Sequence, residues 1–555
     1  MKGRTRIQES KTFKEEFKRR SPAEIIKEHL QLTGFENKAK ALYQTVKELV
    51  ENSLDATEMH GILPDIKVII EEVDKKRSIV KVRVEDNGIG IPPQEIPKAF
   101  GTVFYGSKYV RRQTRGLFGL GVKAAVIYAQ ATTGVPVYIK SAQINSEYIY
   151  EYKISVDIAK NKPIIHHRRR IKNKDLWHGT IVELTLVGDW SRARSRIREY
   201  IKRTAIIAPY ANLILKGPNI LDEYKRTTTK LPPPPLIAKP HPRGIDIESL
   251  KMLIEEKVLE NKLDPPTLYE FLLKEFDGVD RSLVKSFLEW MKMNPKLTID
   301  KLSPDEISKL AAGMREFKAW KRPKAIALSP LGEELLAEGL RKVLEPEYVV
   351  AVSRKPQSYE GHPFIIEVGL AWGGKIPASE EPILLRYANK IPLIYDEKSC
   401  LCYKVVKRID WAHYKVKFPA PLAILIHICS TKIPYSQLNK EVISEKEEIA
   451  REMESAIREA ARKLKRYLLT LEREKQVRQK YINITKYIGE VSRALAIIMK
   501  SNAIGRKLEK QLYSMANQLI LSRRKEILLA RDLIKLKAEI KAPEGFIEYT
   551  RKIRR

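Results

Sequence analysis

The chain shows two spacings of apolar residues, and these spacings predict its helices and strands. Between residues 37 and 60 apolar side chains recur every three or four positions, as on a helix that buries one stripe. Between residues 78 and 85 valines alternate with charged residues, as on a strand with one wet face. Because other strand patterns lie nearby without long helical crossovers, we predict a mostly antiparallel sheet beneath helices. These patterns lie at 66–72, 135–141, 147–156, 180–187 and 212–216, with a helix at 191–208.

A proline-rich segment ends this first pattern. The prolines of LPPPPLIAKPHPRG, residues 231–244, exclude a helix and favour a stiff extended spacer. The next stretch predicts a small all-helical insert, with short helical patterns at 246–259, 266–276, 280–293 and 304–319. From Lys321 an α/β pattern returns, with strand patterns at 348–353, 364–371, 383–387, 391–395 and 422–429.

The remainder of the chain, from Glu441, has a helical pattern. A single apolar seam with a 4-4-3-4-4-3 spacing runs along the first part, through Ile449, Met453, Ile457, Ala460, Leu464, Leu468 and Leu471. A second amphipathic stretch lies between residues 495 and 519. Such a seam must be covered, so we expect either a partner subunit or a helical hairpin that folds back.

Three short polar motifs interrupt the first α/β pattern. In KELVENSLDA, Glu48, Asn52 and Asp55 stand at i, i+4 and i+7, so their side chains share one helix face. DNGIG begins at Asp86, and RGLFGLGVKAA begins at Arg115. A carboxylate, an amide, a turn aspartate and a glycine-rich loop before a helix are the parts needed to hold a nucleotide and activate water. Taken alone, polar residues on a helix are more often a solvated face.

Asp86 continues the buried side of its predicted strand. A carboxylate there needs hydrogen-bond donors, and the glycines of DNGIG let the backbone turn closely around a ligand. The alternative is a hairpin turn, since Asn-Gly is a strong hairpin signal. The three prolines of the following IPPQEIPKAF argue against a partner strand. Thr180, at the start of a later strand pattern, shares its buried face and can enter the same pocket.

The glycine-rich stretch resembles two phosphate loops but satisfies neither pattern. Val122 follows Gly121 where a P-loop has lysine, and no hydroxyl follows Lys123. Residues 119–124 match G-x-G-x-x-A, but a polar loop precedes them where a dinucleotide fold has a strand. The glycines instead indicate a flexible lid, whose backbone N–H groups and following helix N-terminus can surround a phosphate chain.

Net charge and cysteine content limit the kinds of binding partner and the cellular compartment that we expect for this chain. The 555 residues include 103 Lys and Arg against 69 Asp and Glu, a net charge of +34. This favours a polyanionic partner, because neutralising phosphates releases counterions, although a generally basic surface is the alternative. No apolar run approaches the ~18 residues of a membrane span, and the charged start of the chain has no apolar signal core, so we expect a cytoplasmic protein. Three cysteines complete neither a disulfide framework nor a four-ligand zinc site.

The three motifs, in this order, resemble those of the GHKL ATPase superfamily and its Bergerat nucleotide-binding fold. The helical insert after the proline linker, the Ser-Thr-Lys sequence ending at Lys432 and the long C-terminal helix further resemble the B subunits of archaeal type IIB DNA topoisomerases. The resemblance implies an α+β multidomain protein: a Bergerat α/β sandwich with an N-terminal arm at 1–228, a linker and helix-two-turn-helix domain at 229–320, an α/β transducer at 321–470, and C-terminal helices for partner binding at 471–555.

The resemblance also assigns roles to individual residues. It makes Glu48 the general base for the attacking water, Asn52 the magnesium ligand and Asp86 the residue that binds the adenine amino group. Lys432 would reach from the transducer to the γ-phosphate, while Asp55 has only a supporting hydrogen-bond role. Gly90 and Thr180 would line the base pocket, and the phosphates would be enclosed by Ser107, Lys108, Gly116, Leu117, Phe118, Gly119, Leu120, Gly121, Val122 and Lys123.

The function implied is ATP hydrolysis, with Mg²⁺, in a DNA topoisomerase that relaxes supercoils. ATP would close two B subunits around a DNA segment, and double-stranded DNA would be cut by a separate A subunit in an A2B2 assembly. The chain itself shows no paired acidic metal motif for cleavage. Two alternatives stay open: a chaperone or mismatch-repair ATPase of the same superfamily, and a non-catalytic DNA-binding scaffold.

Overall fold

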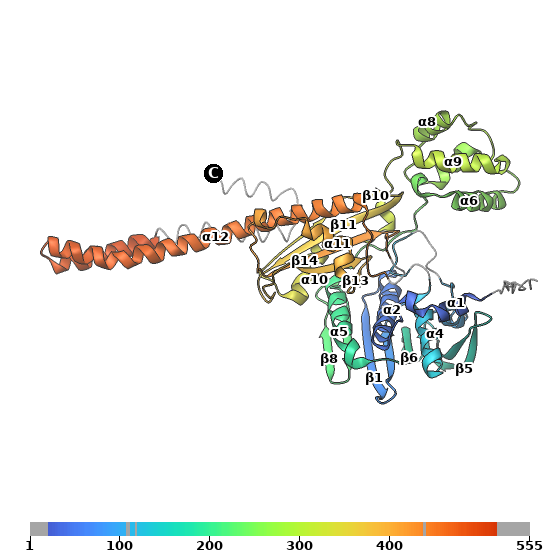
Figure 1. The fold of residues 1–555 in the computed structure, drawn as a ribbon, viewed down its shortest axis with the longest axis horizontal. Helices are drawn as coiled ribbons and strands as arrows, with labels where there is room; N and C mark the ends of the chain where they lie inside the picture. Colours follow the sequence, from blue (N-terminus) through green and yellow to red (C-terminus); the bar gives the residue numbers. More distant parts are fainter. Residues whose placement is uncertain (1–19, 107–111, 117–118, 437–439, 519–555) are drawn as a thin grey trace, which may run out of the picture.

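A computed structural model describes residues 20–106, 112–116, 119–436 and 440–518 (Figure 1). It contains an eight-stranded sheet in the N-terminal half and a six-stranded sheet in the C-terminal half. A small group of helices lies apart from both sheets, and a long helix projects from the second sheet. The architecture is α+β, which confirms the predicted fold class. None of the helices described is both long enough and apolar enough to cross a bilayer.

The first sheet has the strand order β5-β4-β3-β6-β2-β1-β7-β8. All of its neighbouring pairs are antiparallel apart from β1 and β7, as the short connections predicted. Valines 80, 82 and 84 of β2 are buried, whereas the charged residues between them lie on the other face. The strands are β1 Asp65–Asp74, β2 Ile79–Asp86, β3 Val137–Ala142, β4 Tyr148–Asp157, β5 Lys162–Lys172, β6 Gly179–Val187, β7 Asn212–Gly217 and β8 Ile220–Tyr224.

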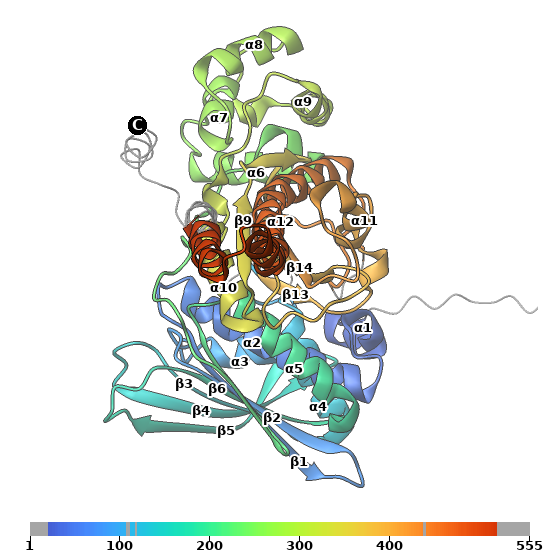
Figure 2. The same ribbon diagram turned by 90° about the vertical axis from the view of Figure 1, so that its left-hand side faces the viewer.

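Helices cover one face of this sheet, and α2 lies at the centre of that layer (Figure 2). The stripe Leu42, Val46, Leu49 and Ser53 of α2 is buried, as its spacing predicted. The open face carries cross-strand ion pairs, such as Arg83 Nη1 to Glu183 Oε1 at 2.5 Å. The covering helices are α1 Pro22–Glu28, α2 Lys38–Glu58, α3 Ile96–Gly101, α4 Gly121–Thr133 and α5 Trp190–Ile207.

Two strands of the first sheet were not among the predicted elements. β5 has the sequence KPIIHHRRRIK, and nine of its eleven residues are exposed. It pairs only with β4 and forms one edge of the sheet. Because most of the residues on both of its faces are exposed, it has no alternation of apolar and polar residues by which to recognise it. β8 is a short strand at the opposite edge, and its sequence ILDEY does not alternate apolar and polar residues either.

The all-helical insert matches its prediction closely. All four of its helices begin with an Asp, Thr or Ser cap that accepts a hydrogen bond from the N3 backbone, and Asp280 also accepts one from the N2 backbone. The insert has its own apolar core, built around Phe271, Phe287 and Leu310. Its helices are α6 Ile247–Glu260, α7 Leu268–Glu275, α8 Arg281–Met291 and α9 Pro304–Glu316.

The second sheet has the order β10-β11-β14-β12-β13, with β9 also paired to β11. Helix α10, Gly332–Leu344, lies between the two sheets and crosses α5 at backbone contact, since a β-carbon on Gly339 would stand 1.8 Å from the carbonyl oxygen of Ile206. Leu336 and Leu340 of α10 belong to the core of the first sheet. The two α/β units therefore share one continuous core. The remaining elements are β9 Tyr348–Ser353, β10 Gln357–Tyr359, β11 His362–Trp372, β12 Ile383–Ala388, β13 Ile391–Leu393, α11 Leu401–Lys407 and β14 Leu422–Ser430.

Helix α12, Glu447–Ile498, covers the second sheet with its first half and projects beyond it with its second. The predicted seam from Ile449 to Leu468 is buried against that sheet, so the chain itself covers it. A further helical segment at 502–518 folds back along the projecting half. Tyr481 Oη donates to Asn517 Oδ1 at 2.7 Å across this hairpin. Of the two expected coverings, a partner subunit or a helical hairpin, the described residues show the helical hairpin.

Candidate functional site

Glu48 lies on α2 and contacts the first residue of α4, Gly121. Asn37 caps the start of α2, where its Oδ1 accepts from the Lys40 backbone at 2.9 Å. Further along the helix, the half-buried Glu48 accepts a hydrogen bond from Gln44 Nε2 at 2.8 Å. A β-carbon built on Gly121 would stand 1.6 Å from Glu48 Oε2, so only glycine leaves the carboxylate in this place. The glycine-rich motif and the helix motif therefore meet at this carboxylate.

Asp86 ends β2 and lies partly buried among hydrogen-bond donors. It accepts from Ser53 Oγ at 2.7 Å, from the Gly88 backbone at 3.0 Å and from the Thr180 backbone at 3.1 Å. The strand register pairs Asp86 with Thr180, which places both at one end of the sheet. Burial raises the pKa of Asp86 to about 6, against the effect of its three donors. Its carboxylate is thus fixed in place and titrates close to neutrality.

The DNGIG segment leads away from β2 without a hairpin. Gly90 has a φ of +73°, and a β-carbon there would lie 2.0 Å from the carbonyl oxygen of Ala142. Gly88 is held against α2, where a β-carbon would lie 2.8 Å from Cβ of Ala56. These close approaches explain why both positions are glycine. The next elements are the short helix α3 and then α4, so the hairpin alternative is wrong.

Two residues of the predicted lid, Val122 and Lys123, have side chains that are buried and engaged within the protein. Lys123 is buried, and its Nζ donates to the carbonyl oxygen of Tyr105 at 2.7 Å. Val122 packs into the hydrophobic core, so only its backbone can face a ligand. Gly119 has a φ of +57°, consistent with a tight turn before α4. Gly116 and Leu120 are described on either side of this turn, whereas Ser107, Lys108, Leu117 and Phe118 lie outside the described residues.

Lys432 follows β14 in a loop of the second α/β unit. Ser430 Oγ accepts from its backbone N–H at 3.1 Å and so holds the start of the loop. The side chain of Lys432 is exposed, and among the described residues it has no hydrogen bond or ion pair. Glu48 and Lys432 are therefore not in contact in this conformation. Their proposed cooperation requires a bound ligand or a rotation of the units.

Sequence reasoning missed a second carboxylate beside Glu48. Glu51 is one turn further along α2 and is buried, and its Oε1 accepts no hydrogen bond from the described residues. Burial, and then the charge of Glu48, raise the pKa of Glu51 to about 8. Glu51 is therefore protonated at neutral pH. Its i+3 spacing from Glu48 was the available signal, because residues three apart are neighbours on a helix.

A buried ion pair joins the same part of α2 to the second α/β unit. Lys47 Nζ lies 2.9 Å from Glu441 Oε1, and both side chains are 1% exposed. Glu441 also accepts from the backbone N–H groups of Ile394 and Tyr395, at 3.0 and 3.2 Å. Lys47, which precedes Glu48, is thus held against the second unit by this ion pair, and the two backbone hydrogen bonds fix Glu441 within that unit.

A separate cavity of about 450 Å³ opens on the helix-free face of the first sheet. Trp177, Ile181, Ile214 and Tyr224 contribute to its lining, together with Asp86 at its edge. Glu48 and Asn52 do not line it, because α2 lies on the opposite face. This cavity shares Asp86 with the predicted nucleotide site, but it lies on the other side of the sheet from α2 (Figure 2).

Family comparisons agree with the division seen in the fold. Residues 37–157 match the family described as histidine kinase-, DNA gyrase B- and HSP90-like ATPases. Residues 323–480 match the topoisomerase VI B subunit transducer. Together with the site on α2, these matches define the class of protein as a GHKL-type ATPase joined to a transducer.

Curated relatives are similar over most of the chain. The B subunit of type 2 DNA topoisomerase 6 from Pyrobaculum aerophilum is 50% identical over 478 residues, which are 86% of this chain and 90% of that one. Its counterpart from Saccharolobus solfataricus is 48% identical over 490 residues, 88% of this chain and 92% of that one. The chain belongs to the family of type 2 DNA topoisomerase 6 B subunits. It is an ATP-hydrolysing topoisomerase subunit, and this replaces the chaperone, mismatch-repair and scaffold alternatives.

Among solved structures, the Aquifex aeolicus MutL ATPase domain complexed with ADP aligns at 13% identity, with a TM-score of 0.31, over 69% of this chain and 90% of that one. A likeness at this level carries no functional argument.

Proposed function

We propose that Glu48 is the general base of ATP hydrolysis and that the Gly119–Gly121 turn holds the phosphates over it. The supporting observation is the contact between Gly121 and the Glu48 carboxylate, which puts backbone N–H groups and a proton acceptor side by side. A base must lie within hydrogen-bond reach of the water that it deprotonates, and the phosphates would sit at the N-terminus of α4. Glu51, one turn further along α2, has its pKa raised to about 8 by burial and then by the charge of Glu48.

Asn52 and Asp86 complete the proposed nucleotide site. Asn52 follows Glu48 by one turn of α2 and would bind Mg²⁺ through its amide oxygen, with phosphate oxygens and water as the other ligands. The ion would neutralise charge on the phosphates. Asp86, held by three donors, would accept a hydrogen bond from the adenine amino group. Gly90 and Thr180 would line the base pocket, and Ser107, Lys108 and the segment 116–123 would enclose the phosphates.

The proposed cycle uses four parts of the chain. Residues 1–228 bind ATP, 229–320 form the linker and helical domain, 321–470 form the transducer, and 471–555 bind the A subunit. ATP would join two B subunits and close them around DNA. Lys432 would contact the γ-phosphate and lose that partner after hydrolysis, so the transducer would rotate. The A subunit would cut the duplex, in an A2B2 assembly acting on DNA in the cytoplasm.

The outer edge of the ATPase sheet supports contact with DNA. Arg168, Arg169 and Arg170 on β5 are exposed, and no carboxylate of the described residues forms an ion pair with them. Arg168 and Arg170 instead lie over the rings of Tyr152 and Tyr148, at 5.7 and 4.2 Å from the ring centroids. Stacking on these rings keeps the guanidinium groups in place with their charge unneutralised. We therefore assign phosphate contacts to this edge.

The projecting hairpin supports docking of the A subunit. Ile484, Tyr487, Val491, Leu495 and Ile498 follow a 3-4-4-3 spacing and are all at least 36% exposed, so they form one apolar stripe on the outside of α12. A contiguous apolar stripe on a protein surface marks an interaction site. Its place at the far end of α12 would let it carry motion of the transducer to another chain.

The test of the catalytic assignment is Glu48→Ala, measured for ATP hydrolysis with DNA and the A subunit present. We expect the hydrolysis rate to fall by about 100-fold or more while nucleotide affinity is kept, because a general base contributes only to the chemical step. Supercoil relaxation should be lost in parallel. Hydrolysis at the wild-type rate would show that Glu48 is not the base.

A further inference from the structure

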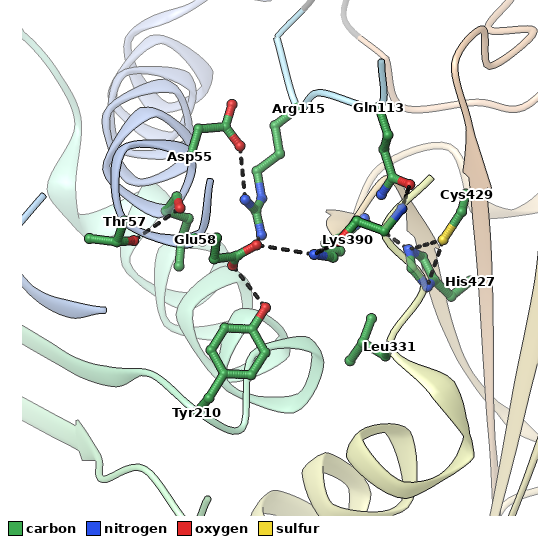
Figure 3. Close-up of polar contacts among 12 residues, drawn as sticks. Asp55, Thr57, Glu58, Gln113, Arg115, Tyr210, Leu331, Lys390, His427 and Cys429 are labelled. Atoms are coloured by element: carbon green, nitrogen blue, oxygen red, sulfur yellow. Dashed lines mark hydrogen bonds and ion pairs between the residues drawn. The ribbon is translucent and has the colours of Figure 1, made fainter. Parts of the chain in front are cut away.

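A buried cluster of charged residues joins the C-terminal end of α2 to the transducer (Figure 3). Glu58, the last residue of α2, accepts from Arg115 Nη2 at 2.7 Å, from Tyr210 Oη at 2.8 Å and from Lys390 Nζ at 3.1 Å. Arg115 Nη1 also donates to Asp55 at 2.9 Å. Two carboxylates thus face two cations, and all four side chains are buried. The same helix that carries Glu48 and Asn52 therefore ends in an ion pair with the other unit.

The cations hold Glu58 ionised in spite of its burial. Burial by itself would raise the pKa of Glu58, but Arg115 and Lys390 outweigh it and hold the pKa below the usual value. The linker prolines 232, 234 and 235 help to close a cavity of about 20 Å³ beside the cluster. Because both side chains are buried, breaking the Glu58–Lys390 pair would leave a buried charge without its partner.

Lys390 belongs to a two-residue turn between β12 and β13. Asn389 and Lys390 have φ values of +49° and +66°, the pair of left-handed conformations found in type I′ hairpin turns. Asn389 exchanges two hydrogen bonds with the backbone of Ser430, at 2.8 and 2.9 Å. Its Nδ2 also donates to the carbonyl oxygen of Thr114 at 3.4 Å. The turn thus contacts the start of the Lys432 loop on one side and the segment before the glycine-rich turn on the other.

The segment Gln113–Arg115 is tied to the transducer at each of its residues. The Gln113 backbone donates to Ala327 at 2.8 Å, and its Oε1 accepts from the Ser329 backbone at 2.8 Å. The carbonyl oxygen of Arg115 accepts from Lys440 Nζ at 3.1 Å. Lys390 Nζ meets the same region through Ser329 Oγ at 2.8 Å. This segment therefore cannot shift without moving its transducer partners or losing several hydrogen bonds.

His427 and Glu367 form a chain of hydrogen bonds that ends at the backbone of the Asn389–Lys390 turn. The Lys390 backbone donates to His427 Nε2 at 2.9 Å, and His427 Nδ1 lies 2.8 Å from Glu367 Oε2. Glu367 also accepts from the backbone at the start of α10. These two residues and Cys429 have ligand atoms within 4.8 Å of one another, as a metal site would. Both ring nitrogens of His427 are already hydrogen-bonded, so the cluster serves to position the turn.

We propose that the Asn389–Lys390 turn transmits the nucleotide state from α2 and the Gln113–Arg115 segment to the Lys432 loop, with Lys390 and Asn389 as positioning residues. The inference rests on the proposed function, in which the transducer moves when the γ-phosphate is lost. One turn contacts all three segments, and its ion pair with Glu58 is buried. A displacement of α2 therefore moves the turn, and the turn moves Ser430.

Two variants remove this link without leaving a buried charge unpaired. Glu58→Gln with Lys390→Met keeps the Asp55–Arg115 pair and retains side-chain volume. Asn389→Gly removes the bonds to Thr114 and Ser430, and glycine suits the left-handed backbone at that position. The matched control is Tyr387→Phe, which deletes a 3.0 Å hydrogen bond from Tyr387 Oη to the Arg203 carbonyl oxygen. That bond also joins the two units, but it does so through α5 and not through α2 or the Gln113–Arg115 segment.

The measurement is the distance between spin labels on the full chain, one at exposed Ser191 of α5 and one at exposed Ser455 of α12. The three native cysteines are buried and can stay in place. In the unsubstituted chain we expect different distances with ADP and with a non-hydrolysable ATP analogue. In both link variants most of this difference should disappear while analogue affinity changes by less than about threefold, and kcat for ATP should fall with little change in KM. Tyr387→Phe should keep the whole difference.

Two results would overturn the proposal. If both link variants keep the full nucleotide-dependent change in distance, the turn does not transmit it. If the unsubstituted chain shows no change between the two nucleotides, the proposed transducer motion itself is wrong and the link has nothing to carry. In the first failure every chain shows the nucleotide-dependent change in distance, whereas in the second even the unsubstituted chain shows none.

Discussion

The carboxylate of Glu48 occupies the space that a side chain at position 121 would need: a β-carbon on Gly121 would lie 1.6 Å from Glu48 Oε2. The atom that would clash is the end of a flexible side chain, so a larger residue would displace the carboxylate and leave the fold intact. Backbone geometry at the first residue of α4 therefore controls the position of the proposed base.

Gly121→Ala should lower ATP hydrolysis by about 100-fold, since a displacement of about 1 Å can have that effect on a positioned group. The melting temperature should hardly change. In a Glu48→Ala background the same substitution should add little, because both changes remove one function. Gly489→Ala, in the exposed part of α12, is the matched control and should leave hydrolysis unchanged. A fully active Gly121→Ala protein would show that position 121 does not control the placement of the Glu48 carboxylate.

Glu51 should make stability depend on pH. Its pKa is raised to about 8 in the folded chain, from 4.5. The folded state then holds an extra proton, so its contribution to stability is present at low pH and is lost as pH rises through about 8. Between pH 6 and pH 8 the free energy of unfolding should fall by on the order of 1–2 kcal/mol more for the unsubstituted chain than for Glu51→Gln. Urea unfolding at several pH values measures this, and parallel curves would refute the assignment.

The basic edge strand should set the salt dependence of DNA binding. Replacing Arg168, Arg169 and Arg170 by serine should weaken binding to duplexes of unrelated sequence alike, and reduce the slope of log K against log salt by about three. Replacing the same residues by lysine keeps the charge and should retain most of the affinity. Fluorescence anisotropy at several salt concentrations distinguishes the two. Equal slopes for the serine and lysine variants would place the phosphate contacts elsewhere.

The apolar stripe of the hairpin should be needed for the A subunit. Tyr487→Glu with Val491→Glu places two charges on the stripe and should abolish copurification with the A subunit, while ATP binding by this chain is kept. Gln476→Glu, at an exposed polar position of the same helix, should have no effect. Truncation after residue 470 should act like the stripe variant. An intact complex after truncation would contradict this docking surface.

Much of the fold was predictable because single segments carry their own signals. The stripe on α2, the alternation in β2 and the prolines of the linker each depend on neighbours in sequence, and the elements appear where those patterns lie. β5 was not predicted because it is a largely exposed strand at the edge of the sheet. An edge strand that is exposed on both faces has no buried side to impose a pattern.

The sequence by itself determined the class of chemistry: a carboxylate and an amide on one helix face, an aspartate at a strand end, and glycines ahead of a helix. Only the tertiary structure decided how these parts meet. The contact of Gly121 with Glu48, the pairing of Asp86 with Thr180 and the ion pair of Glu58 with Lys390 join residues far apart in the chain. Burial also raised the pKa of Glu51 and placed Lys123 against a carbonyl oxygen. Such contacts depend on distance, solvent access and charge in three dimensions, and no local pattern of residues records them.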